Sequence, residues 1–266
     1  MARVMKILFC TVVLLLCSSF AGAQSAGSGG TGVEFPVVTV GTDLWPPFRV
    51  EGRSRGIDGI DIELLNVVGK RMGVTFSVFR FPWSRCLLNM ENGQQDLMPG
   101  LAKTTEREQF ILYTDKPYYT CYPAFYGLKK RGVIVDGYDD LYGKSIGYTR
   151  GSAYFSRFDN DTVLEKLDKN RESQLIQMLL ADRLDLIIGT DCQVEYELAQ
   201  MDRSSEIRKM AYKPKQPIDL YFGVSRQSAF VGRMDELNRV LEELVADGTV
   251  ERISSRYLGD HYSGFH

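Results

Sequence analysis

Short runs of β-branched and other apolar residues alternate along the chain with longer stretches in which apolar residues recur at helical spacing. The clearest helical pattern is Ile60–Met72, where the apolar residues share one face and Gly73 ends the helix. A second helix is predicted at 84–91, with strands at 37–40, 74–79 and 96–98. Short strands separated by helices indicate parallel α/β layers.

The same alternation resumes after a break in the middle of the chain. Strands at 144–148 and 185–188 flank a helix at 172–181, and a long amphipathic helix is predicted at 230–246. The segments 125–129 and 220–224 are predicted to be extended connections. The chain is long enough for one large or two smaller hydrophobic cores.

The first 23 residues have the organisation of a signal peptide. Arg3 and Lys6 precede an apolar stretch at 7–16, and Ala21 and Ala23 form an A-x-A cleavage site. A membrane anchor is the alternative, but about ten apolar residues are too few to span roughly 30 Å of hydrocarbon. We therefore expect cleavage after Ala23 (signal peptide 1–23), export to the periplasm and a flexible leader at 24–35.

Composition excludes several classes of protein. The chain is 44% hydrophobic and 25% charged, which is typical of a globular protein. Cleavage removes two cations and no acid, so the net charge goes from −2 to −4, and no basic face for nucleic acid is apparent. Cys86, Cys121 and Cys192 remain, so at most one disulfide can form and at least one thiol is free.

The stretch PGLAKTTEREQF (99–110) predicts a strand end, a loop and a helix start. Thr105 and Glu108 fit a capping box, which puts Arg107 in the first helical turn. A cation is unfavourable there, because the first turn carries unpaired N–H groups and partial positive charge. Arg107 and these N–H groups would together favour an anion.

Seven motifs in order resemble those of the bacterial extracytoplasmic solute-binding proteins of family 3, the amino-acid-type receptors of ABC importers. They include an opening strand with a "PPF" loop and a loop that ends in the arginine of "TpeR". The matching segments are VGTDLWPPF (40–48), GIDGIDIELL (56–65), NGQQD (92–96), GLAKTTER (100–107), YTDKPYY (113–119), GKSIGYTRGS (143–152) and ADGTVERI (246–253).

This resemblance implies an α/β, two-lobed fold of the type II periplasmic binding proteins. Each lobe would be a mainly parallel sheet flanked by helices, and two hinge segments would allow closure on a ligand. Lobe 1 would comprise 36–125 and the C-terminal helices at 222–266, and lobe 2 with the hinge segments would comprise 126–221. The implied partners are a small carboxylate-bearing solute and an inner-membrane ABC permease; the protein would be a monomer without cofactor or metal.

In this family the arginine of "TpeR" pairs with the ligand's carboxylate, and Arg107 matches that position. Trp45 matches an aromatic residue that covers the ligand side chain, and Asp43 lies in the same loop. Trp83 either faces the cleft or packs in the core, and Arg85 is either a second anion contact or a solvated helix residue. Gly100 and Ala102 stand where the family often has hydroxyl residues, which removes side-chain hydrogen bonds.

In lobe 2, residues 150–153 are predicted to open a helix after a strand. N–H groups near Gly151 and Ser152 could receive a carboxylate, and Ser152 could also cap the helix. The family's acid for the ligand's amino group would fall on Thr190, with Asp191 one residue later. Either a shift brings Asp191 into the site, or the ammonium contact is absent.

The resemblance favours a transport receptor over an enzyme. A cyclohexadienyl dehydratase has the same fold, and a lone cleft carboxylate such as Asp43 or Asp191 could serve such a reaction. His261 and His266 lie in the tail, and no metal-spaced His/Cys cluster is present. A sensor module is the third alternative, but no second membrane segment or signalling domain is expected.

Overall fold

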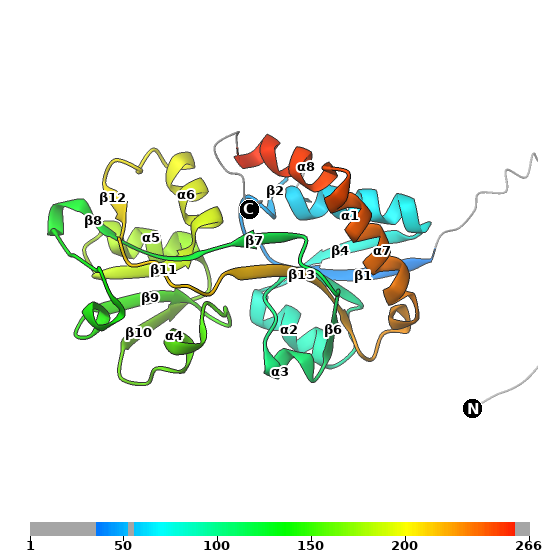
Figure 1. The fold of residues 1–266 in the computed structure, drawn as a ribbon, viewed down its shortest axis with the longest axis horizontal. Coiled ribbons are helices and arrows are strands. Elements are labelled where there is room, and N and C mark those ends of the chain that lie inside the picture. Colours follow the sequence, from blue (N-terminus) through cyan, green and yellow to red (C-terminus); the bar gives the residue numbers. More distant parts are fainter. Residues whose placement is uncertain (1–35, 53–55, 259–266) are drawn as a thin grey trace, which may run out of the picture. The chain divides into compact units, whose positions relative to one another are not determined.

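The computed structural model describes residues 36–52 and 56–258. The predicted signal peptide at 1–23, the leader at 24–35, His261 and His266 lie outside these residues. The described residues belong to one compact unit, which contains two large sheets with helices packed against them and one two-stranded sheet (Figure 1). No helix within 36–52 and 56–258 is long and apolar enough to cross a membrane.

The first sheet has the strand order β4-β1-β5-β13-β6, and β7 pairs with β13. Strand β1 runs parallel to β4 and β5, whereas β13 runs antiparallel to β5, β6 and β7. The bounds are β1 Val37–Thr42, β4 Thr75–Arg80, β5 Leu97–Leu101, β6 Ile111–Tyr113, β7 Tyr119–Cys121 and β13 Ile218–Ser225; a short hairpin pairs β2 Val50–Glu51 with β3 Ile57–Asp58.

Helices cover both faces of this sheet because its strands alternate apolar residues between them. Leu97 of β5 belongs to the core under α1, α7 and α8, whereas its neighbour Met98 packs towards α2. The bounds are α1 Ile60–Met72, α2 Trp83–Glu91, α3 Thr105–Glu108, α7 Met234–Ala246 and α8 Thr249–Leu258.

The sequence predicted the bounds of α1 correctly, because Gly73 takes the left-handed conformation (φ 61°) that ends a helix. The α-helix predicted at 230–246 begins four residues later in the structure than in the prediction. Ala229–Arg233 forms a 3₁₀ turn, and Ser228 accepts from the backbone N–H of Phe230. Regular α-helix therefore starts at Met234.

The second sheet has the strand order β10-β9-β11-β8-β12. Strand β9 is parallel to β10 and β11, and β8 is antiparallel to β11 and β12. The bounds are β8 Pro123–Leu128, β9 Ser145–Thr149, α4 Ser156–Asn160, β10 Glu165–Lys169, α5 Glu172–Leu180, β11 Leu186–Thr190, α6 Asp191–Gln200 and β12 Ile207–Lys209, with 3₁₀ turns at Lys129–Arg131 and Tyr138–Leu141.

Both sheets are mixed. The predicted parallel arrangement is found where β1 pairs with β4 and β5 and where β9 pairs with β10 and β11. Each antiparallel pair of the two large sheets involves β8 or β13, with β5, β6, β7, β11 and β12 as their partners. These include the strands that flank the two points where the chain passes from one sheet to the other.

The chain changes sheets between Cys121 and Pro123 and returns between Lys209 and Ile218. The predicted lobe boundaries after residues 125 and 221 fall inside β8 and β13. Strands β7 and β13 lie side by side along the passage, and Thr120 donates to the Asp219 carboxylate at 2.7 Å. The two connections therefore form one two-stranded ribbon (Figure 1).

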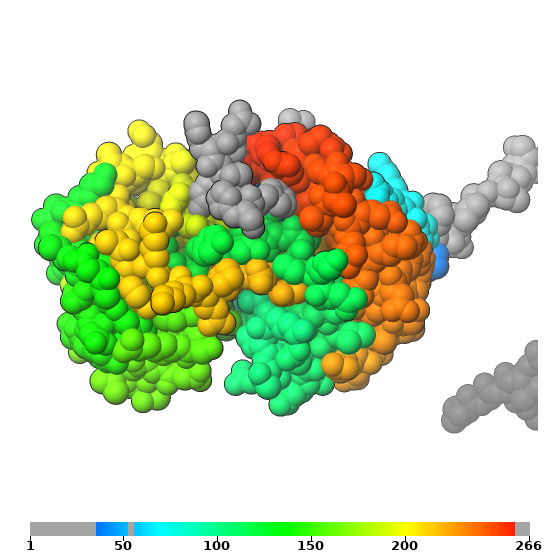
Figure 2. Space-filling model, in the orientation of Figure 1, coloured from blue at the N-terminus to red at the C-terminus, as the bar shows by residue number. Residues whose placement is uncertain are grey.

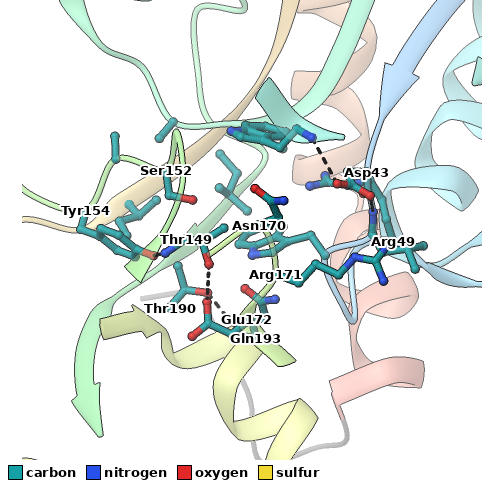
Figure 3. A pocket seen from close by; sticks show the side chains of 18 of the residues that line it. Asp43, Arg49, Thr149, Ser152, Tyr154, Asn170, Arg171, Glu172, Thr190 and Gln193 are labelled. Atoms are coloured by element: carbon teal, nitrogen blue, oxygen red, sulfur yellow. Dashed lines mark hydrogen bonds between the residues drawn. The ribbon is translucent and has the colours of Figure 1, made fainter. Parts of the chain in front are cut away.

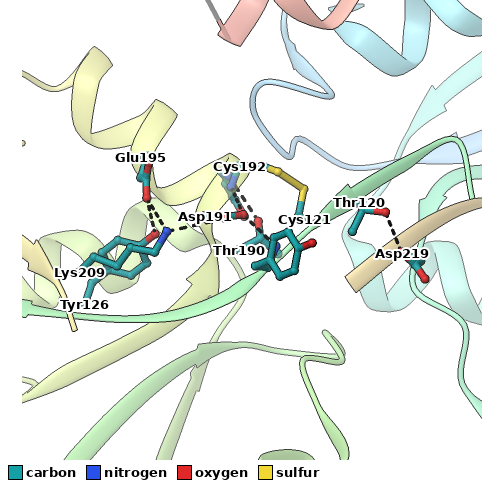
Figure 4. The surroundings of a disulfide bond; sticks show 11 residues. Thr120, Cys121, Tyr126, Thr190, Asp191, Cys192, Glu195, Lys209 and Asp219 are labelled. Atoms are coloured by element: carbon teal, nitrogen blue, oxygen red, sulfur yellow. Dashed lines mark hydrogen bonds and ion pairs between the residues drawn. A yellow bond between two sulfur atoms is a disulfide. The ribbon is translucent and has the colours of Figure 1, made fainter. Parts of the chain in front are cut away.

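A disulfide joins this ribbon to the second sheet. Cys121 at the end of β7 is bonded to Cys192 in the first turn of α6, with a Cα–Cα distance of 5.8 Å (Figure 4). The third cysteine, Cys86, is buried with a free thiol. This agrees with the expected limit of one disulfide and one free thiol.

We predict that replacing both bridged cysteines by alanine lowers the free energy of unfolding by about 4 kcal/mol. The bond closes a loop with a sequence separation of 71 residues, which restricts the unfolded chain strongly. Urea denaturation measures the change, and reductant should weaken the wild type similarly while leaving the double variant unaffected. A loss below about 1 kcal/mol would contradict this.

Candidate functional site

A pocket lies between the two sheets, with about 700 Å³ of space that includes its opening to solvent. The surface is indented between the yellow-green and blue-green parts in Figure 2, and Figure 3 shows the pocket from close by. Its lining comes from both lobes and from β13: Asp43, Leu44, Trp45, Arg49, Trp83, Gly100, Ala102, Arg107, Thr149, Ser152, Ala153, Tyr154, Asn170, Arg171, Glu172, Thr190, Gln193, Ile218 and Leu220.

Arg107 is the buried cation of the first lobe that reaches across the pocket. Its Nη1 donates to the Ala102 carbonyl at 2.8 Å, and its Nη2 donates to the Gly151 carbonyl of the second lobe at 2.6 Å. The side chain forms no salt bridge with any residue that the structure describes, although the residue is 7% exposed. Burial lowers the pKa of Arg107 below its usual value, but a guanidinium stays charged.

The cap of the short helix α3 differs from the prediction. Thr104, not Thr105, is the N-cap, and its hydroxyl accepts from the backbone N–H of Arg107 at 3.3 Å. Thr104 is extended and Thr105 is already helical, so only the former can take the cap conformation. Arg107 still lies in the first turn, as predicted.

Arg49 is the second buried arginine of the pocket, and it has a carboxylate partner. Its guanidinium forms an ion pair with Asp61, whose side chain is fully buried. Tyr118 donates to the other Asp61 oxygen at 2.5 Å, and Arg49 also donates to the Asp43 carbonyl at 2.9 Å. Burial raises the pKa of Asp61 even though Arg49 opposes the shift.

The predicted residues of the first lobe line the pocket together. Trp45 stacks on Phe48 with ring centroids 4.6 Å apart, and the Arg49 guanidinium lies 5.2 Å from the Trp45 ring centroid. Asp43 lies in the wall, where its carboxylate accepts from the N–H groups of Leu44 and Trp83. Asp43 thus holds the start of α2.

Trp83 faces the pocket rather than lying wholly in the core. Its indole N–H donates to the Gly151 carbonyl at 3.1 Å, so this carbonyl receives both Trp83 and Arg107. Arg85, two residues later, is exposed on α2 and does not belong to the pocket lining. Among the residues of α2, the pocket lining therefore includes Trp83, at the start of the helix, and no other.

Gly100 and Ala102 shape the loop beneath Arg107. A Cβ at Gly100 would lie 2.3 Å from the Arg49 guanidinium, and the backbone has φ +71°, so a glycine is needed there. The Ala102 carbonyl accepts from Tyr113 at 3.3 Å as well as from Arg107. The loop therefore holds the side chains of Arg107 and Tyr113 through a backbone carbonyl.

Residues 150–153 do not open a helix. Gly151 has φ +74° in a turn that the Ser152 N–H closes onto the Thr149 carbonyl at 3.1 Å, and α4 begins later, at Ser156. Phe155 is the N-cap residue, so the predicted capping role of Ser152 is wrong. The turn instead directs the Gly151 carbonyl towards the first lobe, and Ser152 lines the pocket.

Thr190 and Asp191 have separate surroundings. Thr190 caps α6, accepts from the Gln193 N–H at 3.3 Å and lines the pocket. The Asp191 carboxylate instead accepts from the backbone N–H groups of Tyr122 and Cys192, at 2.9 and 2.8 Å (Figure 4). Asp191 therefore holds the hinge ribbon to α6 and does not belong to the pocket lining.

The described residues contain one group of possible metal ligands, Cys121, Asp191 and Cys192. Both sulfurs belong to the disulfide, so neither can act as a thiolate ligand. Among 36–52 and 56–258 this group therefore gives no reason to place a metal ion.

Several pocket residues escaped the sequence analysis, chiefly Arg49, Thr149, Tyr154, Asn170, Arg171, Glu172 and Gln193. Glu172 opens α5, and an acid at a helix start is common because it complements the helix dipole. This pattern therefore did not reveal that Glu172 is buried and lines the pocket. Arg49 directly follows the "PPF" loop, and this position beside a family motif is the sequence feature that could have identified it as a pocket residue.

Glu172 is the pocket acid with the most unusual surroundings. It is 3% exposed, and Thr149 donates to its Oε2 at 2.9 Å. Burial, helped by repulsion from Glu197, raises the pKa of Glu172 to about 8. Burial likewise raises the pKa of Glu197 to about 7, although Gln193 donates to that carboxylate at 2.9 Å.

The family model for bacterial extracellular solute-binding proteins, family 3, matches residues 38–260. The chain belongs to this family. The L-cystine-binding protein TcyK of Bacillus subtilis is 26% identical over 271 residues, which cover 97% of this chain and 96% of that protein.

The two-lobed fold that the family resemblance predicted is shared with solved structures. A mutant of ArgBP from T. maritima superposes with a TM-score of 0.73 at 17% identity, covering 84% of this chain and 96% of that one. A histidine kinase sensor domain with similarity to periplasmic binding proteins gives 0.74 at 18% identity, covering 85% and 97%. The fold thus occurs in a binding protein and in a sensor domain.

We predict that Arg49→Met lowers the free energy of unfolding of this family 3 protein by about 3–5 kcal/mol. The change leaves the Asp61 carboxyl buried without its cation. Arg203→Met is the control, since both side chains of its ion pair with Glu206 are about half exposed, and it should cost less than about 1 kcal/mol. Equal urea midpoints for the two variants would contradict the assignment.

We also predict that Glu172→Gln flattens the pH dependence of stability between pH 5 and 8. Folded Glu172 keeps its proton up to about pH 8, whereas in the unfolded chain its pKa has the ordinary value of 4.5. The unfolded state therefore binds fewer protons, and stability falls as pH rises, by at most about 1.4 kcal/mol per pH unit.

Melting temperatures at pH 5, 6, 7 and 8 measure this effect. Glu165→Gln is the control, because the Glu165 side chain is exposed on β10. The melting temperature of Glu172→Gln should rise relative to the wild type as pH increases. Parallel curves for the two proteins would show that Glu172 is not protonated in the folded state.

Proposed function

We propose that this protein is a periplasmic receptor that captures a small carboxylate-bearing solute between its lobes. In this proposal it delivers the solute, an amino acid or a related organic acid, to the inner-membrane permease of an ABC importer. The observation that carries the proposal is Arg107, a buried guanidinium in the pocket that has no carboxylate partner among the described residues.

A solute carboxylate would satisfy Arg107 better than its present partners do. The guanidinium now donates to two neutral backbone carbonyls, on Ala102 and Gly151. A carboxylate offers two charged oxygens in the plane of the guanidinium fork, and charge-assisted bonds of this kind are roughly twice as strong as neutral ones. Neither carbonyl would lose its last donor, because Tyr113 bonds Ala102 and Trp83 bonds Gly151.

The same contact would couple solute capture to the arrangement of the lobes. Arg107 belongs to the first lobe and Gly151 to the second, and Trp83 bonds the same carbonyl. A solute bound by Arg107 would therefore lie where the two lobes meet. The ribbon of β7 and β13 connects the lobes and is the natural place for the backbone to absorb a closing rotation.

The similarity to TcyK, which is named as an L-cystine-binding protein, supports an amino acid or a chemically related solute. Trp45 and Trp83 supply apolar surface for the solute's side chain. The predicted signal peptide at 1–23 supports the periplasmic location. We propose a monomer that needs no cofactor, with Gly100, Ala102, Ser152 and Thr190 completing the site.

An enzymatic role similar to that of a cyclohexadienyl dehydratase is the second candidate. The observation that favours it is Glu172, a pocket carboxyl whose pKa of about 8 keeps it protonated at neutral pH. A protonated carboxyl can serve as a general acid. Turnover of prephenate or arogenate by purified protein, abolished in Glu172→Gln, would favour this candidate over the transport receptor.

We predict that Arg107→Met lowers the affinity for carboxylated solutes at least ~100-fold, because two charge-assisted hydrogen bonds are lost. A thermal-shift screen of amino acids and organic acids finds the binders, since saturation at ~100 times the dissociation constant should raise the melting temperature by about 5–10 °C. Calorimetry then measures the affinities of wild type and variant.

Arg85→Met is the matched control, because Arg85 is exposed on α2 outside the pocket lining. It should retain wild-type affinity. The solute-free Arg107→Met protein should melt close to the wild type, since Arg107 forms no ion pair within the described residues and interacts with Asp159 only from a longer distance. An affinity within tenfold of the wild type for Arg107→Met would overturn the proposed carboxylate contact.

A further inference from the structure

Glu172 leaves one hydrogen-bond acceptor unused on the pocket wall of the second lobe. Its Oε2 accepts from Thr149, but its Oε1 is buried and has no hydrogen-bond partner among the residues that the structure describes. Buried polar atoms are rarely left unpaired in folded proteins, because the desolvation cost is then not offset. An unpaired carboxyl oxygen on a residue that lines the pocket therefore needs an explanation.

The neighbouring backbone is shaped to leave room for this oxygen. A Cβ at Gly189 of β11 would lie 2.8 Å from Glu172 Oε1. Thr149 at the end of β9 holds the other oxygen, and Thr190 follows Gly189 in the pocket wall (Figure 3). Glu172 is thus held in one orientation by the ends of two adjacent strands.

No cation in the described part of the chain forms an ion pair with Glu172. Glu197 approaches from α6 and Tyr154 from the segment after β9; burial, and to a smaller extent Glu172, raises the pKa of Tyr154. On its own helix the adjacent Arg171 is exposed, and neither Glu172 nor Arg171 forms a salt bridge within the described residues. Burial and Glu197 both disfavour the charged carboxylate, and the Thr149 hydrogen bond is the opposing influence.

The pocket therefore contains two complementary groups, on opposite lobes, that form no ion pair within the described residues. Arg107 on α3 interacts with the carboxylates of Asp159 and Glu106 only from a longer distance, and Glu172 on α5 has no described donor for its Oε1. They do not pair with one another. A solute that carries both an anionic and a cationic group could satisfy both, and it would also link the lobes.

We propose that Glu172 is the specificity-determining residue for a basic nitrogen of the solute, whose carboxylate pairs with Arg107. The inference rests on the proposed function, and it narrows the solute class to molecules with a carboxylate and a protonated amine. Glu172 acts here in place of an acid at position 190, which is Thr190 in this chain.

This assignment makes capture proton-linked. The pKa of Glu172 is about 8 in the solute-free protein, so the carboxyl is mainly neutral at pH 7. An ammonium group of the solute pairs with the ionised form of Glu172 and not with the neutral carboxyl. Glu172 therefore releases its proton to solvent when the solute binds. Affinity should then rise with pH by up to about tenfold per unit below pH 8, provided that the solute amine stays protonated.

The experiment compares amino acids with their desamino analogues by calorimetry. The probe pairs are L-cystine with 3,3′-dithiodipropionate and L-glutamate with glutarate, because each of these analogues carries no cationic group. We expect at least one amino acid to bind at least tenfold more tightly than its analogue. Its affinity should rise between pH 6 and 8, and its apparent enthalpies in phosphate and Tris should report release of up to one proton.

Glu172→Gln keeps the size of the side chain and removes the charge. It should bring amino acid and analogue within about threefold and abolish the pH dependence. Glu197→Gln is the matched control, because it removes the neighbouring acid and leaves Glu172 in place. That variant should keep the discrimination and move the pH midpoint downwards, which a merely structural role for Glu172 would not produce.

Two results would overturn the inference and leave the proposed function standing. One is equal, Arg107-dependent binding of amino acids and their analogues. The other is a Glu172→Gln protein that folds, by its melting temperature, and keeps the discrimination and the pH dependence. Failure of every probe to bind, or binding that survives Arg107→Met, would overturn the proposed function and this inference together.

Discussion

The site depends on a buried positive charge, Arg107, that forms no ion pair with any residue the structure describes; the carboxylates of Asp159 and Glu106 act on it only from a longer distance. Arg107 is held in place by two backbone carbonyls, one from each lobe. A guanidinium is expensive to remove from water, and carbonyl dipoles offset this cost less well than a carboxylate does. The arrangement is therefore suited to a bound anion, and it places that anion where the two lobes meet.

The surrounding structure keeps the pocket walls fixed around this charge. Arg49 resembles Arg107 in burial and pocket position, but Asp61 and Tyr118 complete its partners, so it serves as part of the wall. On the other side, the Cys121–Cys192 bond and Asp191 hold the hinge ribbon against the start of α6. Thr190 and Gln193 are thereby presented to the pocket. Arg49 and Arg107 thus differ in role because Arg49 pairs with the Asp61 carboxylate, whereas Arg107 forms no ion pair within the described residues.

The sequence predicted those features that depend on local chemistry. The apolar face and Gly73 defined α1, and the family motifs identified Arg107, Trp45 and the loop of Gly100 and Ala102. Local reasoning failed where neighbouring hydroxyls compete, as with Thr104 and Thr105, and where a turn precedes a helix, as at Ser152. It could not identify Glu172, since the pKa of that side chain depends on burial by β9, β11 and α6, which are distant in the sequence.

The most direct test of the account is a crystal structure of the protein with a carboxylated solute identified by the thermal-shift screen. The account predicts both carboxylate oxygens at about 2.7–2.9 Å from guanidinium nitrogens of Arg107, in the plane of the fork. A bound solute whose carboxylate lies elsewhere, with Arg107 still bonded to the carbonyls of Ala102 and Gly151, would contradict it.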